Sequence, residues 1–419
     1  MSSNLYFDYQ ATTPVDPSVS KVIYDSLKSD WGNPSSPHEF GIKAKLTIEN
    51  ARKQVGQLIN SKATDIIFTS GGTESNNIAL FSGLEHWKVQ NLKKSNKALP
   101  HYIISNVEHP AVAEPVKKMV SDGLVTVSYL STNKDGTVDT DGISMELMKH
   151  PNTIMISVML VNNETGVINN IKRLVQLVRE FEQGRERMGC GRSSGNRIFV
   201  HTDAAQAIGK IHVNVVDLDI DYLTIVGHKV YGPRIGALYA KNTGIETPVF
   251  PIVFGAGQER GYRPGTENTP MIAGLGKVSI YIIKNLYFFF LGFAFDVYLS
   301  GNHANDKEER VVSSLQDPRK LGLLLDLVTK LAENGIFIGR GSACHSGISK
   351  PSPVLTAMGV DNDTALTSLR FSVGRETSAS DVDIFVSVYY QSQRSVLMDH
   401  MLNNSTSLPH ASPFANLKK

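Results

Sequence analysis

Short apolar runs alternate with longer amphipathic stretches between about residues 64 and 238. The runs are rich in β-branched residues, and two of the clearest, Ile66–Ser70 and Tyr222–Val226, each end at a glycine turn. Continuous apolar runs are typical of strands that are buried on both faces, and the stretches between them fit crossover helices. The pattern predicts an α/β fold with a mainly parallel, doubly wound sheet.

The remaining parts of the chain suggest where its domains begin and end. We predict an N-terminal segment at residues 1–20, a large domain at 21–270 and a smaller α/β C-terminal domain at 271–393. The final stretch, 394–419, and the loop 184–196 are polar or rich in Gly and Ser, so we expect both to be mobile.

Two charged side chains follow predicted strands. Asp203 ends the run Arg197–Asp203, and Lys229 follows Tyr222–Val226 in a Gly-His-Lys turn. Each could have an ordinary role, because an Asp after a strand often caps the next helix and most lysines are surface charges. The two strands fit one β-x-β unit, whose strands end at the same sheet edge, so the carboxylate and the amine would face one crevice. Pyridoxal phosphate needs such a pair, a Lys for a Schiff base and an Asp that keeps the ring nitrogen protonated.

A candidate phosphate site and a candidate ring-stacking residue lie upstream. A Gly71-Gly72 turn joins a strand to a predicted helix that begins at Thr73. Amide groups and the dipole at the start of a helix attract anions, and Thr73 adds a hydroxyl. The glycines have neither Walker nor Rossmann spacing. A further strand leads to His109, either a buried, hydrogen-bonded histidine or a ring stacked on a flat cofactor.

These residues and the segments around them resemble the pyridoxal-phosphate enzymes of the cysteine desulfurase and selenocysteine lyase group, within the fold type I aminotransferase superfamily. The similar segments follow the order of the family, and the ordered series is far more specific than any single motif. They are Leu5–Pro14, Trp31–His38, Phe68–Ser75, Glu108–His109, Val161–Gly166, His201–Gln206, Gly227–Gly232, Tyr262–Asn268, Gly341–Ser346 and Leu369–Arg375. The resemblance implies a fold type I pyridoxal-phosphate transferase with a large and a small domain.

The resemblance also implies a role for each matching residue. Lys229 would bind pyridoxal 5'-phosphate, Asp203 would contact its ring nitrogen, and His109 would stack on the ring and move protons. The other implied contacts are Asn163 and Gln206 to the phenolic oxygen, Gly72, Thr73 and His228 to the phosphate, Thr266 to the phosphate of the other subunit, and Arg370 and Asn33 to the substrate. Many members carry a phosphate-binding Ser where this chain has Val226, so that hydroxyl is missing here.

The chain has two cysteines, too few for a disulfide framework. Cys190 lies in a Gly-rich, basic stretch that fits an exposed loop. Cys344 lies in a loop of small residues, where its thiol would be accessible and His345 could favour the thiolate. The resemblance implies that Cys344 is catalytic: in the desulfurases this cysteine carries a persulfide, and in the selenium enzymes it acts on the leaving selenium.

Two segments favour the selenium branch of the group over the desulfurase branch. Cys344-His345-Ser346 and the downstream Lys-Pro-Ser-Pro at 350–353 are similar to the lyases, whereas desulfurases tend to have Thr at the position of His345. We therefore expect conversion of L-selenocysteine to L-alanine and reduced selenium. The alternatives are a cysteine desulfurase that forms a persulfide on Cys344 and a non-catalytic, cofactor-binding isoform.

Composition limits the partners. A formal net charge of +2 over 419 residues, without a Lys/Arg cluster, gives no sign of nucleic-acid binding. The apolar runs are too short to cross a membrane. We expect a small-molecule substrate, and the family implies a homodimer and a possible selenium-acceptor protein. The N-terminus lacks a signal pattern and the family motifs start at Leu5, which together with reduced cysteines favours a cytosolic location.

Residues 280–310 depart from the family. Ile280–Phe295 is aromatic and interrupted, and a polar stretch follows it. The family has a long helix and then a strand with a Pro-Asn motif in this region, and we find neither pattern here. Our hypothesis is that an alternative exon replaces part of the small domain, which would give the non-catalytic isoform.

Overall fold

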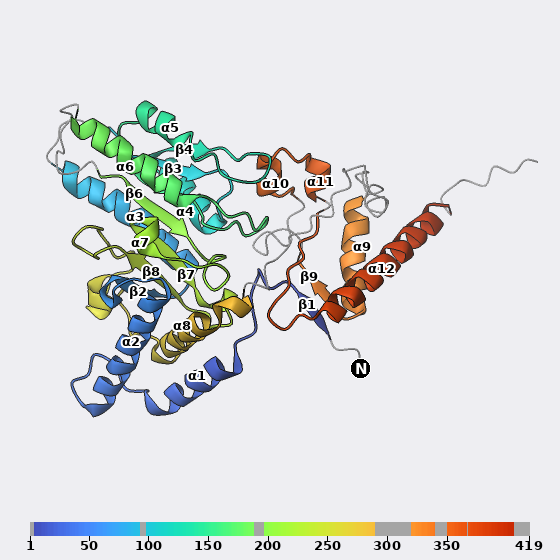
Figure 1. Ribbon diagram of the computed structural model, residues 1–419, viewed down its shortest axis with the longest axis horizontal. Coiled ribbons are helices and arrows are strands. Elements are labelled where there is room, and N and C mark those ends of the chain that lie inside the picture. Colours follow the sequence, from blue (N-terminus) through green and yellow to red (C-terminus); the bar gives the residue numbers. More distant parts are fainter. Residues whose placement is uncertain are drawn as a thin grey trace, which may run out of the picture.

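The computed structural model describes residues 4–92, 98–187, 197–289, 320–339, 350–366 and 368–405 (Figure 1). Its centre is a seven-stranded sheet with the order β2-β8-β7-β6-β5-β3-β4. All neighbouring strands are parallel except β8, which runs antiparallel to β2 and β7. The strands are β2 (Ile66–Thr69), β3 (His101–Ser105), β4 (Thr126–Leu130), β5 (Thr153–Ser157), β6 (Phe199–Asp203), β7 (Tyr222–Val226) and β8 (Gly236–Ala240).

Both faces of the sheet are buried, because successive side chains of a strand point to opposite sides. Along β3, Ile103 belongs to one hydrophobic core and its neighbours Tyr102 and Ile104 belong to the other. One core is covered by α3 (Gly72–Asn91) and α4 (Pro110–Ser121). Helices that contribute to the opposite core are α2 (Glu39–Leu58), α5 (Ile143–Lys149), α6 (Ile171–Arg187), α7 (Val215–Leu218) and α8 (Thr269–Phe289). The predicted doubly wound α/β fold is confirmed.

The start of α8 belongs to the larger unit. The helix packs along α1 (Pro17–Ser29) and α2, and Leu275 and Val278 lie in the large core. The boundary that we predicted at residue 271 therefore falls inside this helix, and we propose that it lies beyond Phe289. Our expectation that no long helix occupies the atypical segment is wrong for residues 280–289, which belong to α8, although the helix is kinked at Asn285. Apolar residues predominate there and hide the helical period. Residues 290–310 lie outside the described ranges.

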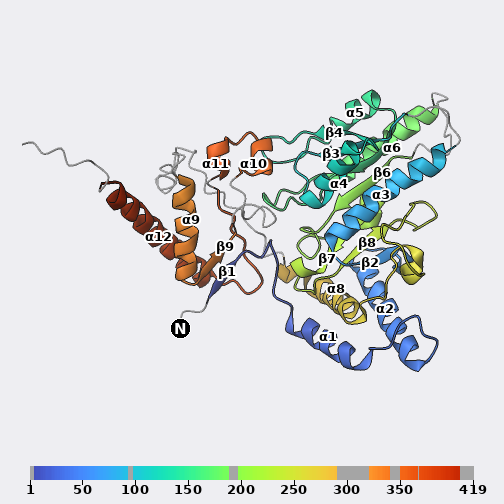
Figure 2. The same cartoon turned by 180° about the vertical axis from the view of Figure 1, so that it is seen from behind.

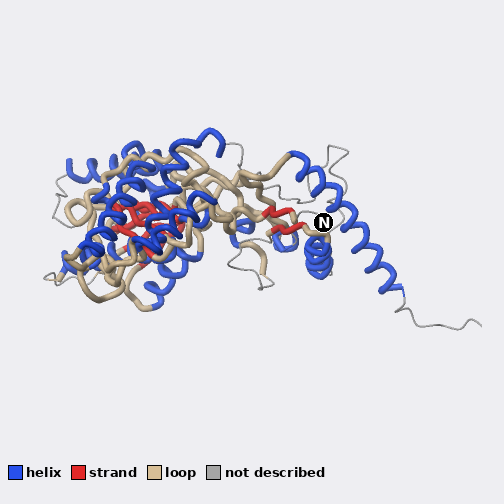
Figure 3. The backbone as a smooth tube through the Cα atoms, turned by 90° about the horizontal axis from the view of Figure 1, so that it is seen from below, coloured by secondary structure: helices blue, strands red, loops and turns tan. Residues whose placement is uncertain are grey.

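The smaller unit joins the two ends of the chain (Figure 2). Its strands β1 (Leu5–Phe7) and β9 (Ile336–Ile338) pair in parallel, and α9 (Lys320–Glu333) packs against α12 (Ala379–Ser405). Figure 3 shows this strand pair apart from the central sheet. The predicted N-terminal segment 1–20 is thus divided between the two units, and the tail predicted at 394–419 is helical up to Ser405. The pairing of β1 with β9 divides the N-terminal segment, and a local pattern does not reveal this long-range contact.

The segment between β1 and α1 carries contacts from one unit to the other. The backbone N–H of Gln10 donates to Ser372 Oγ at 3.1 Å, and Arg375 contacts the Asp16 carboxylate at 2.7 Å.

Two short helices, α10 (Pro353–Ala357) and α11 (Asn362–Leu366), come after β9 in the sequence. Val354 of α10 packs in the hydrophobic core of the larger unit. None of the helices in the described ranges has the length and hydrophobicity that a bilayer span requires.

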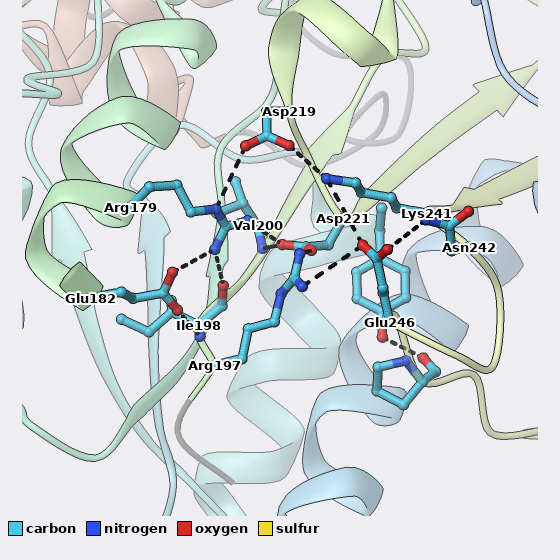
Figure 4. Close-up of polar contacts among 12 residues, drawn as sticks. Arg179, Glu182, Arg197, Ile198, Val200, Asp219, Asp221, Lys241, Asn242 and Glu246 are labelled. Atoms are coloured by element: carbon cyan, nitrogen blue, oxygen red, sulfur yellow. Dashed lines mark hydrogen bonds and ion pairs between the residues drawn. The ribbon is translucent and has the colours of Figure 1, made fainter. Parts of the chain in front are cut away.

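A charged network closes the end of the sheet where β6 and β7 begin (Figure 4). The Asp221 carboxylate is fully buried and contacts Arg179 at 2.7 Å and Arg197 at 2.5 Å. It also accepts the amide N–H of Val200 at 2.8 Å. Two arginines and a backbone amide compensate the buried charge, as a desolvated carboxylate requires. This network stabilises the N-terminal ends of the strands, opposite to the C-terminal ends that carry Asp203.

Candidate active site

Nine of the twelve residues predicted to act in the site line one cavity of about 200 Å³ at the C-terminal ends of the sheet strands. This edge is where open α/β sheets bind their ligands. The nine are Gly72, Thr73, His109, Asn163, Asp203, Gln206, His228, Lys229 and Arg370. Asn33 and Thr266 are exposed and do not line it, and Cys344 lies outside the described residues.

Lys229 is presented by a tight turn after β7. The short 3-10 helix η2 (Gly227–Lys229) follows the strand directly, and a Cβ atom at Gly227 would lie 2.5 Å from the carbonyl oxygen of Pro233. The N-terminal segment holds this turn, because the His228 carbonyl accepts the Thr13 amide at 2.8 Å and the Thr13 hydroxyl at 3.0 Å. The Thr-Thr-Pro motif near the start of the chain therefore positions the turn that carries Lys229.

Asp203 ends β6 and has both oxygens engaged. Its Oδ2 accepts the side-chain amide of Asn76 at 2.8 Å, and its Oδ1 accepts the backbone N–H of Ala205 at 2.9 Å. The contact to Ala205 is a local cap of the kind that an ordinary Asp would make. The side chain nevertheless lines the cavity, with 6% of the residue exposed. Asp203 thus serves the turn and presents a carboxylate to the site.

The start of α3 provides the candidate phosphate site. The first amide groups of a helix have no partners within it and point outward. A Cβ atom added at Gly71 would meet no heavy atom within 4 Å, so there is open space at this end. At Gly72 the same atom would lie 2.6 Å from Cγ2 of Val226, so only glycine fits there. Burial, together with the charges of Lys229 and Arg234, lowers the pKa of His228 to about 4, which leaves its ring neutral near pH 7.

His109 makes the ordinary hydrogen-bonded contact that the sequence allowed, and it also lines the cavity. It is the N-cap of α4, and its Nδ1 accepts the amide N–H of Ala111 at 3.1 Å. A neutral ring held in this way carries its proton on Nε2.

The neighbouring Glu108 is buried. Its Oε1 accepts the Ser105 hydroxyl proton at 2.5 Å and the backbone N–H of Met159 at 2.8 Å. Burial raises the pKa of Glu108 to about 8.

Arg370 reaches the cavity from the smaller unit. One Nη donates to the Asn163 carbonyl at 3.2 Å, and the other contacts the Asp8 carboxylate at 2.7 Å. Its backbone pairs with Gly339, where an added Cβ atom would lie 2.6 Å from Asp8. The Nε of Arg370 and the Oδ1 of Asn163 are buried and have no hydrogen-bond partner among the described residues. The cavity therefore offers a donor and an acceptor that a ligand could satisfy.

Sequence reasoning missed several contributors to the site. Asn76 and Gln10 line the cavity, and Asp8 orients Arg370. Asn76 could have been found, since it lies three residues after Thr73 and therefore on the same face of the helix. Gln10 and Asp8 gave no such local signal. Gln10 lines the cavity and Asp8 contacts Arg370, and both positions depend on the pairing of β1 with β9, which lie far apart in the sequence.

Comparison with known proteins agrees with this arrangement. A family model described as aminotransferase class-V matches residues 5–288. The selenocysteine lyases of Homo sapiens and Xenopus tropicalis are each 40% identical over 91% of this chain, and the matches cover 90% and 91% of their own lengths. The cysteine desulfurase IscS of Dictyoglomus turgidum is 36% identical over 93% of this chain and 94% of its own.

Solved structures share the fold. A NifS-like protein aligns over 94% of this chain and 100% of its own, with a TM-score of 0.73 and 26% identity. A structure of SspA in complex with cysteine aligns over 89% of this chain and 100% of its own, with a TM-score of 0.68 and 29% identity.

Proposed function

Because this chain belongs to the aminotransferase class-V family, we propose that it is a pyridoxal-phosphate-dependent lyase that converts L-selenocysteine to L-alanine and reduced selenium. The observation that carries the proposal is the meeting of Lys229, Asp203 and Arg370 in one cavity. An amine, an anionic partner for a ring nitrogen and a planar cation for a carboxylate are the groups that amino-acid chemistry on this cofactor requires.

The cavity fits the cofactor by its own chemistry. The open helix start at Gly71 and Gly72 suits a phosphate, and the buried carboxylate of Asp203 suits a protonated ring nitrogen. The buried Oδ1 of Asn163, which lacks a partner among the described residues, suits a hydroxyl or other donor on the ring. Gly72, Thr73 and His228 would hold the phosphate, and Asn163 and Gln206 would lie at the phenolic oxygen.

The residues of the chain divide the work of the reaction. When bound, pyridoxal phosphate supplies an electron sink for the negative charge that develops at the α-carbon. Lys229 would hold the cofactor through its amine, and its Nζ would accept the α-proton of the substrate. His109 would cover the ring, and its Nε2 proton faces away from the helix cap. Arg370 orients the substrate carboxylate through its two-donor fork.

Cys344 is proposed to assist the departure of selenium. The described residues that flank 340–349 contact residues in or beside the cavity: Gly339 pairs with Arg370, which lines it, and Ser352 donates to Glu164 at 2.5 Å, next to Asn163, which also lines it. Selenolate leaves more easily than thiolate, so the enzyme can prefer selenocysteine without a pocket that measures the size of the atom. Such a pocket would discriminate poorly, because near-isosteric substrates are hard to reject by shape.

The proposal includes a homodimer in which Thr266 reaches the phosphate of the second copy. Apolar side chains are exposed on α1, α2 and the turn between them, among them Trp31 (65%) and Leu46 (64%), and Trp31 stacks on Phe40 at 4.9 Å. Exposed apolar surface of this kind is typical of an interface. Sedimentation tests the dimer: the wild type should sediment as a dimer, and Trp31→Asp combined with Leu46→Asp should give monomers.

The proposal also includes a selenium-acceptor protein and a cytosolic location. A pull-down experiment would test the acceptor, and cell fractionation would test the location.

The function is tested by measuring alanine release from L-selenocysteine and L-cysteine side by side. The proposal predicts that selenocysteine turns over much faster, that Cys344→Ala lowers this rate, and that Cys190→Ala, the matched control, does not. Comparable turnover of cysteine with a persulfide on Cys344 would show a cysteine desulfurase instead, the activity of the IscS relative. Bound cofactor without alanine release from either substrate would show a non-catalytic isoform.

A further inference from the structure

A chain of buried polar side chains lies behind Asp203. Its first links are the Ser157 hydroxyl at 2.8 Å from Nδ1 of His201 and Nε2 of His201 at 3.2 Å from the Thr224 hydroxyl. The Thr224 hydroxyl then donates to Oδ1 of Asn76 at 2.6 Å, and Nδ2 of Asn76 donates to Oδ2 of Asp203 at 2.8 Å. The first four residues are completely buried.

The sheet brings these residues together. His201 precedes Asp203 by two positions on β6, so both side chains point to the same face. Thr224 of β7 lies opposite Asp203 in the register, and Ser157 of β5 lies opposite His201. Asn76 completes the chain from α3, which covers this face.

The hydrogen bonds can run in only one direction. The Thr224 hydroxyl has one proton and gives it to Asn76, so it must accept from Nε2 of His201. A neutral imidazole with its proton on Nε2 accepts at Nδ1, so the Ser157 hydroxyl must be the donor there. Every bond in the chain therefore points its positive end towards Asp203. Hydrogen bonds aligned in this way strengthen one another in a medium of low dielectric constant.

The state of His201 agrees with this direction. Burial lowers the pKa of His201 to about 4, against the opposing charge of Asp203, so the ring is neutral near pH 7. A positively charged ring would donate from both nitrogens and would leave the Ser157 proton without an acceptor in the chain. The neutral ring fits both of its partners.

We propose that Ser157, His201, Thr224 and Asn76 are positioning residues: the first three fix the Asn76 side-chain amide with its NH₂ group towards Asp203, and Asn76 in turn holds this carboxylate in place for the ring nitrogen. The inference rests on the proposed function, because the cofactor gives the carboxylate its role. Without the Thr224 donor, the Asn76 amide could turn and place its carbonyl oxygen against the carboxylate, and the grip on the ring nitrogen would weaken.

Thr224→Val is the main test, because valine keeps the methyl group that packs beside Gly72 and removes only the hydroxyl. We expect the Kd for pyridoxal phosphate to rise about tenfold, because the Asn76 amide would no longer be held and its hydrogen bond to the charged Asp203 carboxylate would weaken. Thr224→Ser, which keeps the hydroxyl, should restore wild-type affinity. The matched control is Thr202→Val on the same sheet. The Thr202 hydroxyl donates to the Val158 carbonyl at 2.7 Å and takes no part in the series of hydrogen bonds from Ser157 to Asp203. It should leave the Kd unchanged.

A second readout needs no cofactor. In cofactor-free protein labelled with ¹⁵N-asparagine, the Asn76 side-chain amide should exchange slowly with solvent and should shift in Thr224→Val but not in Thr202→Val. An unchanged amide and an unchanged Kd in Thr224→Val would overturn the proposal, as would equal effects of the two valine variants. Failure of the wild type to bind pyridoxal phosphate would instead refute the proposed function, and the amide signal would still report on the chain.

Discussion

The guanidinium of Arg370 lies 2.7 Å from the carboxylate of Asp8, a residue 362 positions earlier in the chain. Asp8 directly follows strand β1, so the contact ties the end of this strand to a residue that lines the cavity. Asp8 and the Asn163 carbonyl fix the plane of the guanidinium, while its Nε, buried and without a partner among the described residues, remains for a ligand. A preoriented fork of this kind suits a carboxylate better than a mobile cation does.

Replacement of Arg370 by lysine should therefore impair substrate binding. Lysine keeps the charge and loses the planar fork, so we expect KM for the amino-acid substrate to rise roughly tenfold or more, with a smaller fall in kcat. Arg375→Lys is the matched control, since Arg375 joins the same two units through Asp16 without lining the cavity. It should lower the melting temperature and leave KM unchanged. Similar KM values in the two variants would contradict the role of Arg370.

Val226 marks the place where a hydroxyl could be added to the phosphate site. Threonine has nearly the shape of valine, and its hydroxyl could donate to a charged phosphate oxygen. Val226→Thr should lower the Kd for pyridoxal phosphate about threefold to tenfold in equilibrium dialysis. The same change at Val200, buried in β6 away from the cavity, should lower stability without improving affinity. A Kd for Val226→Thr that equals or exceeds the wild-type value would show that the phosphate lies elsewhere.

The network around Asp221 should matter for stability and not for the cofactor. Asp221→Asn leaves the charges of Arg179 and Arg197 without their buried anionic partner, so the free energy of unfolding should fall by about 3 kcal/mol in urea titrations. Asp219→Asn, whose side chain is 51% exposed, should cost about 1 kcal/mol or less. The Kd for pyridoxal phosphate should not change in either variant, because the network lies at the opposite edge of the sheet. Equal losses of stability would be inconsistent with a buried anchor at Asp221.

Glu108 gives the protein a pH dependence of defined sign. Burial raises its pKa from 4.5 to about 8, so the folded state holds a proton that the unfolded state releases between these values. This group stabilises the fold below about pH 4.5, and its contribution is lost as the pH rises through about 8. Glu108→Gln should therefore flatten the decline of unfolding free energy across this window, measured by urea titration.

Glu114→Gln is the control for this measurement, since Glu114 is on α4 with its side chain 63% exposed. It should keep the wild-type slope. A wild-type stability that does not decline in the window, or a Glu108→Gln slope that equals the wild-type slope, would show that Glu108 is ionised in the folded protein.

Local patterns were sufficient to predict the parts of the site that lie at strand ends. Lys229 and Asp203 each follow an apolar run, so the sheet alone brings them to one edge. The pairing of Asp8 with Arg370 could not be predicted, because it depends on β1 pairing with β9 from the other end of the chain. His201 and Thr224 could be assigned to strands from the sequence. No local pattern, however, distinguishes members of a hydrogen-bonded series from ordinary buried polar residues. The helix at 280–289 was not predicted because its apolar residues do not follow an amphipathic period.

Reduction with sodium borohydride, followed by mass spectrometry of the peptides, tests most directly the claim that this cavity holds pyridoxal phosphate on Lys229. The account predicts that the mass of the reduced cofactor is found on Lys229. Lys210, which donates to Gln206 at 2.5 Å, should be unmodified and serves as a control beside the site. Modification of a lysine other than Lys229, or no modification after saturation with pyridoxal phosphate, would contradict the account.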